Sequence, residues 1–155
     1  MKRILKWAIG LLVLNAVVWL AGQAYTRSKT SSNLDGEDLD LYTFWNGDEF
    51  VTRSPSLHRV KVRVLMGGAS IDLRQAVPAP NGMTVDVSTT MGGIAVLVRK
   101  DWDVEVIERT KNAAVEIDLD RGAVSTSDSP KVTVVLRTAY GGALVGYELP
   151  SERVT

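Results

Sequence analysis

The sequence lacks cysteine altogether and contains a single histidine, His58. Without cysteine the chain can form no disulfide, no thiolate metal site and no cysteine nucleophile. One histidine also leaves the chain without the usual general base and without histidine-rich zinc sites. An excess of charge of either sign is missing too, because 18 basic residues balance 18 acidic residues. Binding to the phosphate backbone of nucleic acids needs a clustered basic excess, so we expect no nucleic-acid partner.

The neutral total hides an uneven distribution along the chain. Residues 1–25 hold three basic residues and no acid, so they carry +3 and the remainder carries −3. An apolar stretch runs from Trp7 to Ala21 with Asn15 as its one polar residue, and extended to Tyr25 it has 19 residues. As a helix it would measure about 27 Å, near the thickness of a bilayer core. We predict a single-pass anchor in the cell membrane over residues 1–25, with the basic end inside and the domain extracytoplasmic.

A cleavable signal peptide is the competing interpretation of the same segment, because Gly22-Gln23-Ala24 offers a small-x-small cleavage site. Both interpretations direct the chain to a membrane. Residues 26–40 are polar and lack any helical or strand period, so they predict a flexible linker. Acidic residues gather at its end: Asp35, Glu37, Asp38 and Asp40. They do not have the spacing of a calcium loop, and we interpret them as solvated charge.

The remainder of the chain contains an internal repeat. From Val60 onward, short stretches alternate apolar and polar residues, which is typical of half-buried strands. The stretches align on four small-residue pairs, Gly67-Gly68, Gly92-Gly93, Ala113-Ala114 and Gly141-Gly142, separated by 25, 21 and 28 residues. Three apolar columns accompany the pairs: Val60, Val85, Val106 and Val134; Ile71, Val96, Ile117 and Val145; and Leu73, Val98, Leu119 and Tyr147. We expect these side chains to point inward, and Asp72, Glu116 and Asp118 to face solvent.

The repeat predicts an all-β domain over residues 41–149, built as a short β-solenoid of stacked rungs and followed by a tail at 150–155. A β-sandwich of four hairpins is the alternative fold. Glycine at each corner permits a positive φ and a close approach of neighbouring backbones, so we expect the unit with Ala113-Ala114 to turn differently. Phosphate binding by the glycine pairs is not favoured, because neither Lys-Ser/Thr nor a helix follows them.

Three segments of the repeat resemble a known family: Val64–Ala76, Thr90–Val104 and Thr138–Val145. They contain a Gly-Gly unit followed by Ile-Asp-Leu-Arg-Gln-Ala, a second that ends in Trp-Asp-Val, and a closing Gly-Gly strand. This combination is similar to the C-terminal domain of the LiaF-like proteins, the cell wall-active antibiotics response family of bacterial envelope-stress regulators, over roughly residues 44–148. The resemblance implies a stacked β-rung fold, sometimes called a toast-rack, in a non-catalytic module tied to membrane sensing and two-component signalling.

We therefore expect a non-catalytic, membrane-anchored module that binds or regulates partner proteins in the bacterial cell-envelope stress response, with no catalytic, cofactor-binding or metal-binding residue. A structural, self-associating envelope protein is the alternative, since the ends of a repeat stack present unpaired strand edges, one of which Pro150, Glu152 and Arg153 would blunt. Less favoured is an envelope hydrolase with paired acids two residues apart on a strand, either Asp118 with Asp120 or Asp101 with Asp103.

Two aromatic residues and the histidine complete the candidates. Trp45 and Trp102 are interpreted as aromatic caps over the stack of units rather than as ligand platforms. His58 lies just before the first repeat strand, and we assign it no role.

Overall fold

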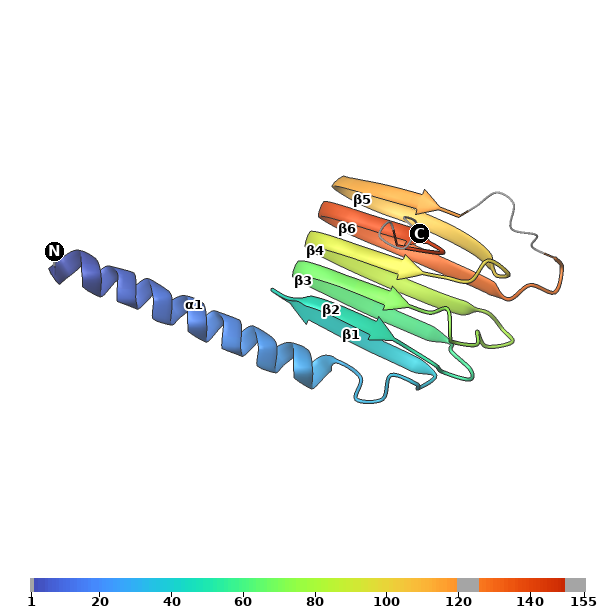
Figure 1. Ribbon diagram of the computed structural model, residues 1–155, viewed down its shortest axis with the longest axis horizontal. Helices are drawn as coiled ribbons and strands as arrows, with labels where there is room; N and C mark the ends of the chain where they lie inside the picture. The colour runs from blue at the N-terminus through green and yellow to red at the C-terminus, as the bar shows by residue number, and fades with distance from the viewer. Residues whose placement is uncertain (1, 120–125, 150–155) are drawn as a thin grey trace.

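The computed structural model describes residues 2–119 and 126–149, with side chains from Leu11 onward. One helix, α1 (Lys2–Lys29), precedes six strands: β1 (Asp38–Phe44), β2 (Gly47–Val51), β3 (Arg59–Asp72), β4 (Met83–Leu97), β5 (Asp103–Asp118) and β6 (Lys131–Gly146). The six strands form one sheet in which every described pairing is parallel. Figure 1 shows them as a stack beside the end of α1. The domain is mostly β, as predicted, and the antiparallel hairpins of the sandwich alternative do not occur among these strands.

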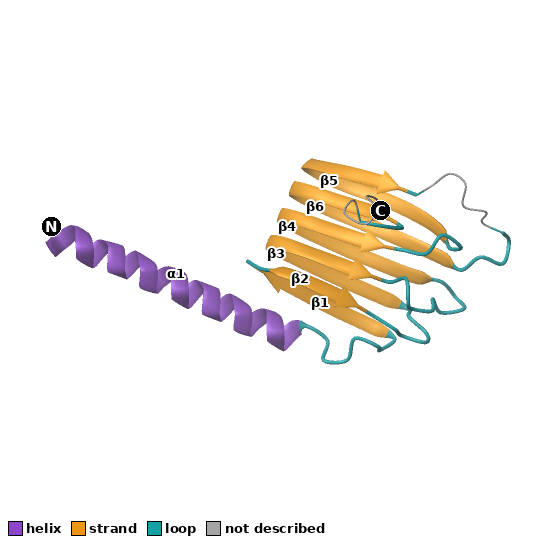
Figure 2. Ribbon diagram, in the orientation of Figure 1, coloured by secondary structure: helices purple, strands orange, loops and turns teal. Residues whose placement is uncertain are grey.

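Each long strand turns back on itself and so has two legs (Figure 2). The turn lies at a residue with a positive φ: Met66 in β3, Met91 in β4, Asn112 in β5 and Tyr140 in β6. The pairing between strands skips these residues and resumes directly after them. β1 and β2 are the two legs of a further unit, because they pair with the two legs of β3 and because Trp45 between them also has a positive φ. The stack therefore has one unit more than the repeat indicated.

The columns aligned in the sequence are columns of the sheet. The first holds Val60, Val85, Val134 and Val106; the second holds Gly67, Gly92, Gly141 and Ala113; the third holds Ile71, Val96, Val145 and Ile117. Inward-facing members of the inner strands form the core, and Val60, Val85 and Val134 are fully buried in it. The order in space differs from the order in sequence, since the strands follow the path β1-β3-β4-β6-β5. The last strand of the chain thus lies between β4 and β5.

The composition of β5 explains its position at the outside of the stack. In the column where Val62, Val87 and Leu136 are fully buried, β5 carries Glu108. A carboxylate in an inward column is stable only beside water, and inward-pointing charge is one way in which edge strands avoid unwanted pairing. The inward apolar side chains of β5 are correspondingly less covered, since Ile117 is 42% exposed whereas Ile71, Val96 and Val145 of the same column are buried.

At the opposite end of the stack, α1 is attached to β1 rather than held on a flexible linker. The sequence predicts a linker over residues 26–40, whereas the helix continues to Lys29 and β1 begins at Asp38. The Ser31 amide donates to the carbonyl oxygen of Asp40 at 2.7 Å, and the Asp40 amide donates back to Ser31 Oγ at 2.8 Å. These bonds lie on the outer edge of β1, so the connection between α1 and the sheet is shorter than predicted and is hydrogen-bonded to the sheet.

Further contacts fix the last turns of α1 on the same strand. The Tyr42 amide donates to Thr30 Oγ1 at 3.2 Å, and the rings of Tyr25 and Tyr42 meet edge to face at 6.5 Å. Gly22 faces the ring of Phe44 so closely that a Cβ atom there would lie 2.1 Å from it. The helix therefore separates from the domain only on the N-terminal side of Gly22.

No helix in the described part of the chain is both long enough and apolar enough to span a membrane. The predicted anchor, residues 1–25, begins outside that part, because the side chains of residues 1–10 are not described. The predicted tail at 150–155 also lies outside the described residues.

Candidate binding surfaces

A column of glycines in direct backbone contact runs along the corners of the stack. A Cβ atom on Gly92 would lie 2.0 Å from the carbonyl oxygen of Gly67, and one on Gly141 would lie 1.8 Å from that of Gly92. The second glycine of a pair is under no such constraint, since a Cβ on Gly93 would meet nothing within 4 Å. The first glycines thus permit the close approach that the sequence predicted. These first glycines face the backbone of the neighbouring strand, so they serve the packing of the strands rather than the binding of a phosphate.

The left-handed turn expected of the glycines belongs to the residue before each pair. The unit with Ala113-Ala114 turns like the others, contrary to the prediction, because Asn112 has a φ of 50° where Met66 has 55°. Asparagine enters this region more readily than most residues. Ala113 occupies the glycine column next to Gly141. Since β5 has a described neighbour on one side only, a methyl group there has room that the inner strands lack.

The turn residues of the first four units in the stack form an apolar surface, which we call the corner row: Trp45, Met66, Met91 and Tyr140. Trp45 is 52% exposed, and Met91 and Tyr140 are each 56% exposed. Trp45 is thus half exposed at the turn of the first unit, and its interpretation as a cap over the stack stays a prediction. Trp102 is buried in the core cluster.

A second apolar surface surrounds the free part of α1. Its exposed side chains are Leu11, Leu12, Val13, Leu14, Val17, Val18, Trp19 and Leu20, with exposed fractions between 47% and 70%. Consecutive helical residues point about 100° apart, so the run from Leu11 to Leu14 alone covers the whole circumference. Asn15 is satisfied within the helix, because its Nδ2 donates to the carbonyl oxygen of Leu11 at 3.1 Å. A helix that is apolar on all sides needs an apolar environment.

The acid pairs considered for catalysis are not arranged as the strand spacing assumed. Asp101 lies in the turn before β5, and both of its carboxylate oxygens accept bonds from the Arg99 guanidinium, at 2.7 and 2.8 Å. Asp103 is the first residue of β5, so the two acids do not share one face of a strand. Asp118 ends β5, and its proposed partner Asp120 lies outside the described residues.

The acidic run before and within β1 is dispersed over separate contacts. The carboxylate of Asp35 accepts from the Arg53 amide at 2.7 Å, and that of Asp38 lies 3.9 Å from Arg59 Nε. In the described part of the chain, no three histidine, aspartate or glutamate residues lie together in a way that could hold a metal ion.

Asp72 departs from its predicted place on the solvent face. Its carboxylate receives Arg74 Nε at 3.0 Å, Arg74 Nη2 at 2.7 Å and the Arg74 amide at 2.9 Å, and its side chain is 13% exposed. The hydrogen bonds from Arg74 lower the pKa of Asp72 below its ordinary value, although burial opposes them. Arg74 Nη1 also reaches the carbonyl oxygen of Tyr147 at 3.3 Å. The Ile-Asp-Leu-Arg segment therefore joins β3 to the chain that follows β6.

His58 is exposed, and its backbone holds the first repeat strand in place. Its amide donates to the carbonyl oxygen of Glu37 at 2.8 Å, and its own carbonyl oxygen accepts from the Thr84 amide at 3.0 Å. The imidazole has no role in these bonds.

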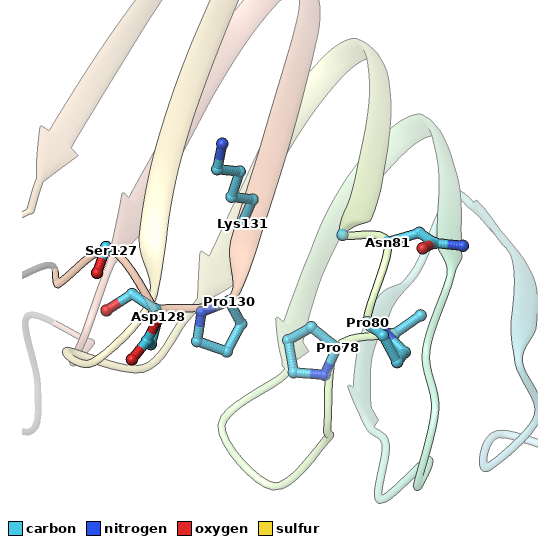
Figure 3. A pocket seen from close by; sticks show the side chains of 10 residues that line it. Pro78, Pro80, Asn81, Ser127, Asp128, Pro130 and Lys131 are labelled. Carbon is cyan, nitrogen blue, oxygen red and sulfur yellow. The ribbon is translucent and has the colours of Figure 1, made fainter.

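The loops at the end of the stack away from the turn residues enclose a hollow of about 330 Å³. Two loops line it, residues 78–82 and residues 127–131. Figure 3 shows the rings of Pro78 and Pro130 facing each other across it, while the Lys131 side chain points away from Asp128. Without convergent polar groups the hollow has no arrangement that would orient a ligand.

Three buried threonine hydroxyls, those of Thr43, Thr89 and Thr138, have no hydrogen-bond partner in the described part of the chain. They belong to one inward column, in which Val64 occupies the place between Thr43 and Thr89. Buried polar groups without partners destabilise a fold by about 1–3 kcal/mol each. A valine in the same column shows that the packing accepts an apolar side chain there.

Sequence reasoning missed the first unit and the attachment of the helix. The first unit turns at Trp45-Asn46-Gly47 and so lacks the small-residue pair on which the repeat was aligned. The alternation of Leu39 and Leu41, which pair with Val60 and Val62, was the available signal.

Comparison of the chain with known protein families, with curated proteins and with solved structures gives no match. The similarity to the LiaF-like family stays a prediction from the three sequence segments.

Proposed function

We propose that this chain is a non-catalytic β-solenoid module, anchored in the cell membrane by α1, that binds a partner protein in the cell-envelope stress response. The observation that carries the proposal is the apolar surface around residues 11–20 of α1, which is exposed on all sides. Lipid is the environment that a helix of this kind fits. The sequence supports the orientation, because the three bases before the apolar stretch outnumber Arg27 and Lys29 after it, which favours the cytoplasm for the N-terminal end.

The β-solenoid is the finer description that we give to the parallel stack. Each unit makes one turn of a coil, and in-register columns connect neighbouring units. Stacks of this type bind through extended surfaces rather than through a single deep pocket. The assignment to envelope stress and to two-component signalling depends on the resemblance to the LiaF-like domain alone.

The anchor is tested by extracting membranes with alkaline carbonate. The full chain is expected to stay in the membrane fraction. Replacing Leu14 and Val17 together by lysine should release it, because charge in a bilayer core costs about 2.5–3.5 kcal/mol per residue. Val77→Lys is the control, since Val77 is similarly exposed, at 52%, but lies in a loop. Release of the unchanged chain would overturn the anchor.

Topology and partner are tested in intact cells. A C-terminal tag should be open to added protease, and the N-terminus of the mature protein should begin at residue 1 or 2. A protected tag would overturn the orientation, and a new N-terminus after Ala24 would establish a signal peptide. Crosslinking in intact membranes should recover a second protein in an amount that changes under envelope stress. Recovery of this chain alone in both conditions would contradict the regulatory role.

Self-association is the second candidate, and it is favoured by the side of β5 on which no described strand pairs. β5 pairs with β6 on one side and with no described strand on the other, whereas hydrogen bonds from α1 and its connection occupy the outer edge of β1. Two stacks joined through β5 would make a closed pair rather than a fibre. Sedimentation of the full chain in detergent tests this. Ile107→Lys should then shift the chain to the monomer, and a monomer at all concentrations of the unchanged chain would dismiss the idea.

A further inference from the structure

The corner row combines two unfavourable features that a purely structural turn would avoid. Its members have φ values of 52° to 56°, a region that costs a residue other than glycine or asparagine about 1–2 kcal/mol. The side chains of Trp45, Met91 and Tyr140 are also more than half exposed to solvent. Asn112, at the equivalent position of β5, shows that the fold accepts a polar residue suited to this conformation. Strain kept at exposed apolar residues indicates a role outside the fold.

The position of the corner row relates it to α1. Figure 1 shows that the last turns of the helix lie beside β1 and that the rest of the helix extends past the end of the stack where the strands turn. Trp45 lines a shallow hollow with Leu12 and Trp19, and Asn46 lines a second one with Gln23 and Arg27. The first corner thus lies beside the part of α1 where the helix leaves the surface of the domain. The apolar surface of the helix continues directly into the corner row.

We propose that the corner row rests in the interfacial layer of the membrane that holds α1, with Trp45, Met91 and Tyr140 at the boundary between headgroups and acyl chains. This inference rests on the anchoring of α1 given under Proposed function. Tryptophan and tyrosine favour that boundary because their rings are apolar and their N–H or O–H groups are polar. The stacked units would then stand with their turns on the lipid surface and their opposite loops away from it.

Charges near the corner row are compatible with this contact. Lys111 directly precedes the turn of β5 and shares a column with Ala139 and Leu65, so its amino group would meet the headgroups. In the first unit the carboxylate of Asp48 accepts a hydrogen bond from Asn46 Nδ2 at 3.0 Å. Leu65, 46% exposed, adds apolar area directly before the turn of β3.

The absence of native cysteine makes the test direct. Single cysteines are introduced by Val13→Cys in α1, Met91→Cys in the corner row and Val77→Cys in a loop at the other end of the stack. The replaced side chains are matched in exposure, at 56%, 56% and 52%. Each full chain is labelled with a fluorophore and reconstituted into vesicles of phosphatidylcholine and phosphatidylglycerol. Nitroxide-bearing lipids, with the nitroxide near the headgroup or deep in the acyl chain, report which label touches lipid.

The expected result is loss of fluorescence at position 13 with the deep nitroxide, loss at position 91 with the shallow nitroxide, and unchanged intensity at position 77. Quenching at position 13 without quenching at 91 overturns the corner-row inference and leaves the anchor standing. That result would indicate that a protein, rather than lipid, covers the corner row. No quenching at any position overturns both. Tyr140→Cys repeats the measurement at a second corner, and it decides the matter if the Met91 variant does not fold.

Discussion

Replacing Gly92 by alanine tests whether close backbone contact in the glycine column determines the spacing of the stack. A Cβ atom at this position would lie 2.0 Å from the Gly67 carbonyl oxygen, and that atom cannot rotate away because it belongs to the backbone. Real Cβ contacts begin at about 3.0 Å. β3 and β4 must therefore separate by about 1 Å at the corner, in a parallel sheet whose strands are spaced about 4.8 Å apart.

The expected cost follows from that separation. Overpacking of a tight site costs about 1–3 kcal/mol, and weakening two flanking backbone hydrogen bonds adds about 1 kcal/mol each. Gly92→Ala should thus lower the free energy of unfolding by about 3–5 kcal/mol. A loss of this size is a large part of the 5–15 kcal/mol that is usual for a domain.

Urea denaturation of the full chain in mild detergent, followed by circular dichroism of the β band, measures the effect. The matched control is Gly93→Ala, one residue away in the same corner, where a Cβ meets nothing within 4 Å. Its free energy of unfolding should stay within about 0.5 kcal/mol of the unchanged chain. If Gly92→Ala costs no more than Gly93→Ala, the stacking explanation of the glycine pairs is refuted.

Three further substitutions test the column of threonines, the Asp72 contact and the strain of the corner row. Thr89→Val should raise the free energy of unfolding by about 1 kcal/mol, because it removes a buried hydroxyl without a partner; a loss of stability would show that water satisfies that group. Asp72→Asn should lower the free energy of unfolding by about 1–2 kcal/mol at neutral pH, since the substitution replaces the charged acceptor of Arg74. The pKa of Asp72 is lowered from 3.8 by folding, so this contribution is complete above pH 3.8 and is lost as pH falls through the folded value; a difference between the two chains that persists unchanged at pH 2 would contradict the assignment. Met91→Asn should stabilise the chain in detergent by up to about 1 kcal/mol, because asparagine tolerates the left-handed turn, while reducing its contact with lipid vesicles. Thermal melting in detergent measures each of these changes in stability.

Much of the register could be predicted from the sequence because both of its causes are local. Alternation of side chains fixes which residues face inward, and the close approach of backbones requires a small residue at one place in each inner unit. The residues that the sequence aligns with Val60, Gly67 and Ile71 are therefore the residues that pair with them in the sheet. The turn residue itself was missed, because methionine and tyrosine carry no local preference for a positive φ.

The order of the strands depended on the tertiary structure. The spacing of the repeats along the chain does not tell which units are neighbours in the sheet. The connection from β4 to β5 crosses over the position that β6 later occupies between them. Glu108 in an inward column and Ala113 in the glycine column are residues that could have indicated an outer strand.

The sequence by itself determined that this chain would combine an apolar N-terminal helix with a repeat of two-legged β units, since period, small-residue spacing and the apolar run are properties of neighbouring residues. Only the tertiary structure decided that β6 lies between β4 and β5, that Trp45 is the turn of an additional first unit, and that the end of α1 is hydrogen-bonded to β1. These features depend on contacts between residues far apart in the chain, where burial of apolar surface and satisfaction of backbone hydrogen bonds choose the partner. The same contacts bring the turns of the stack beside the helix.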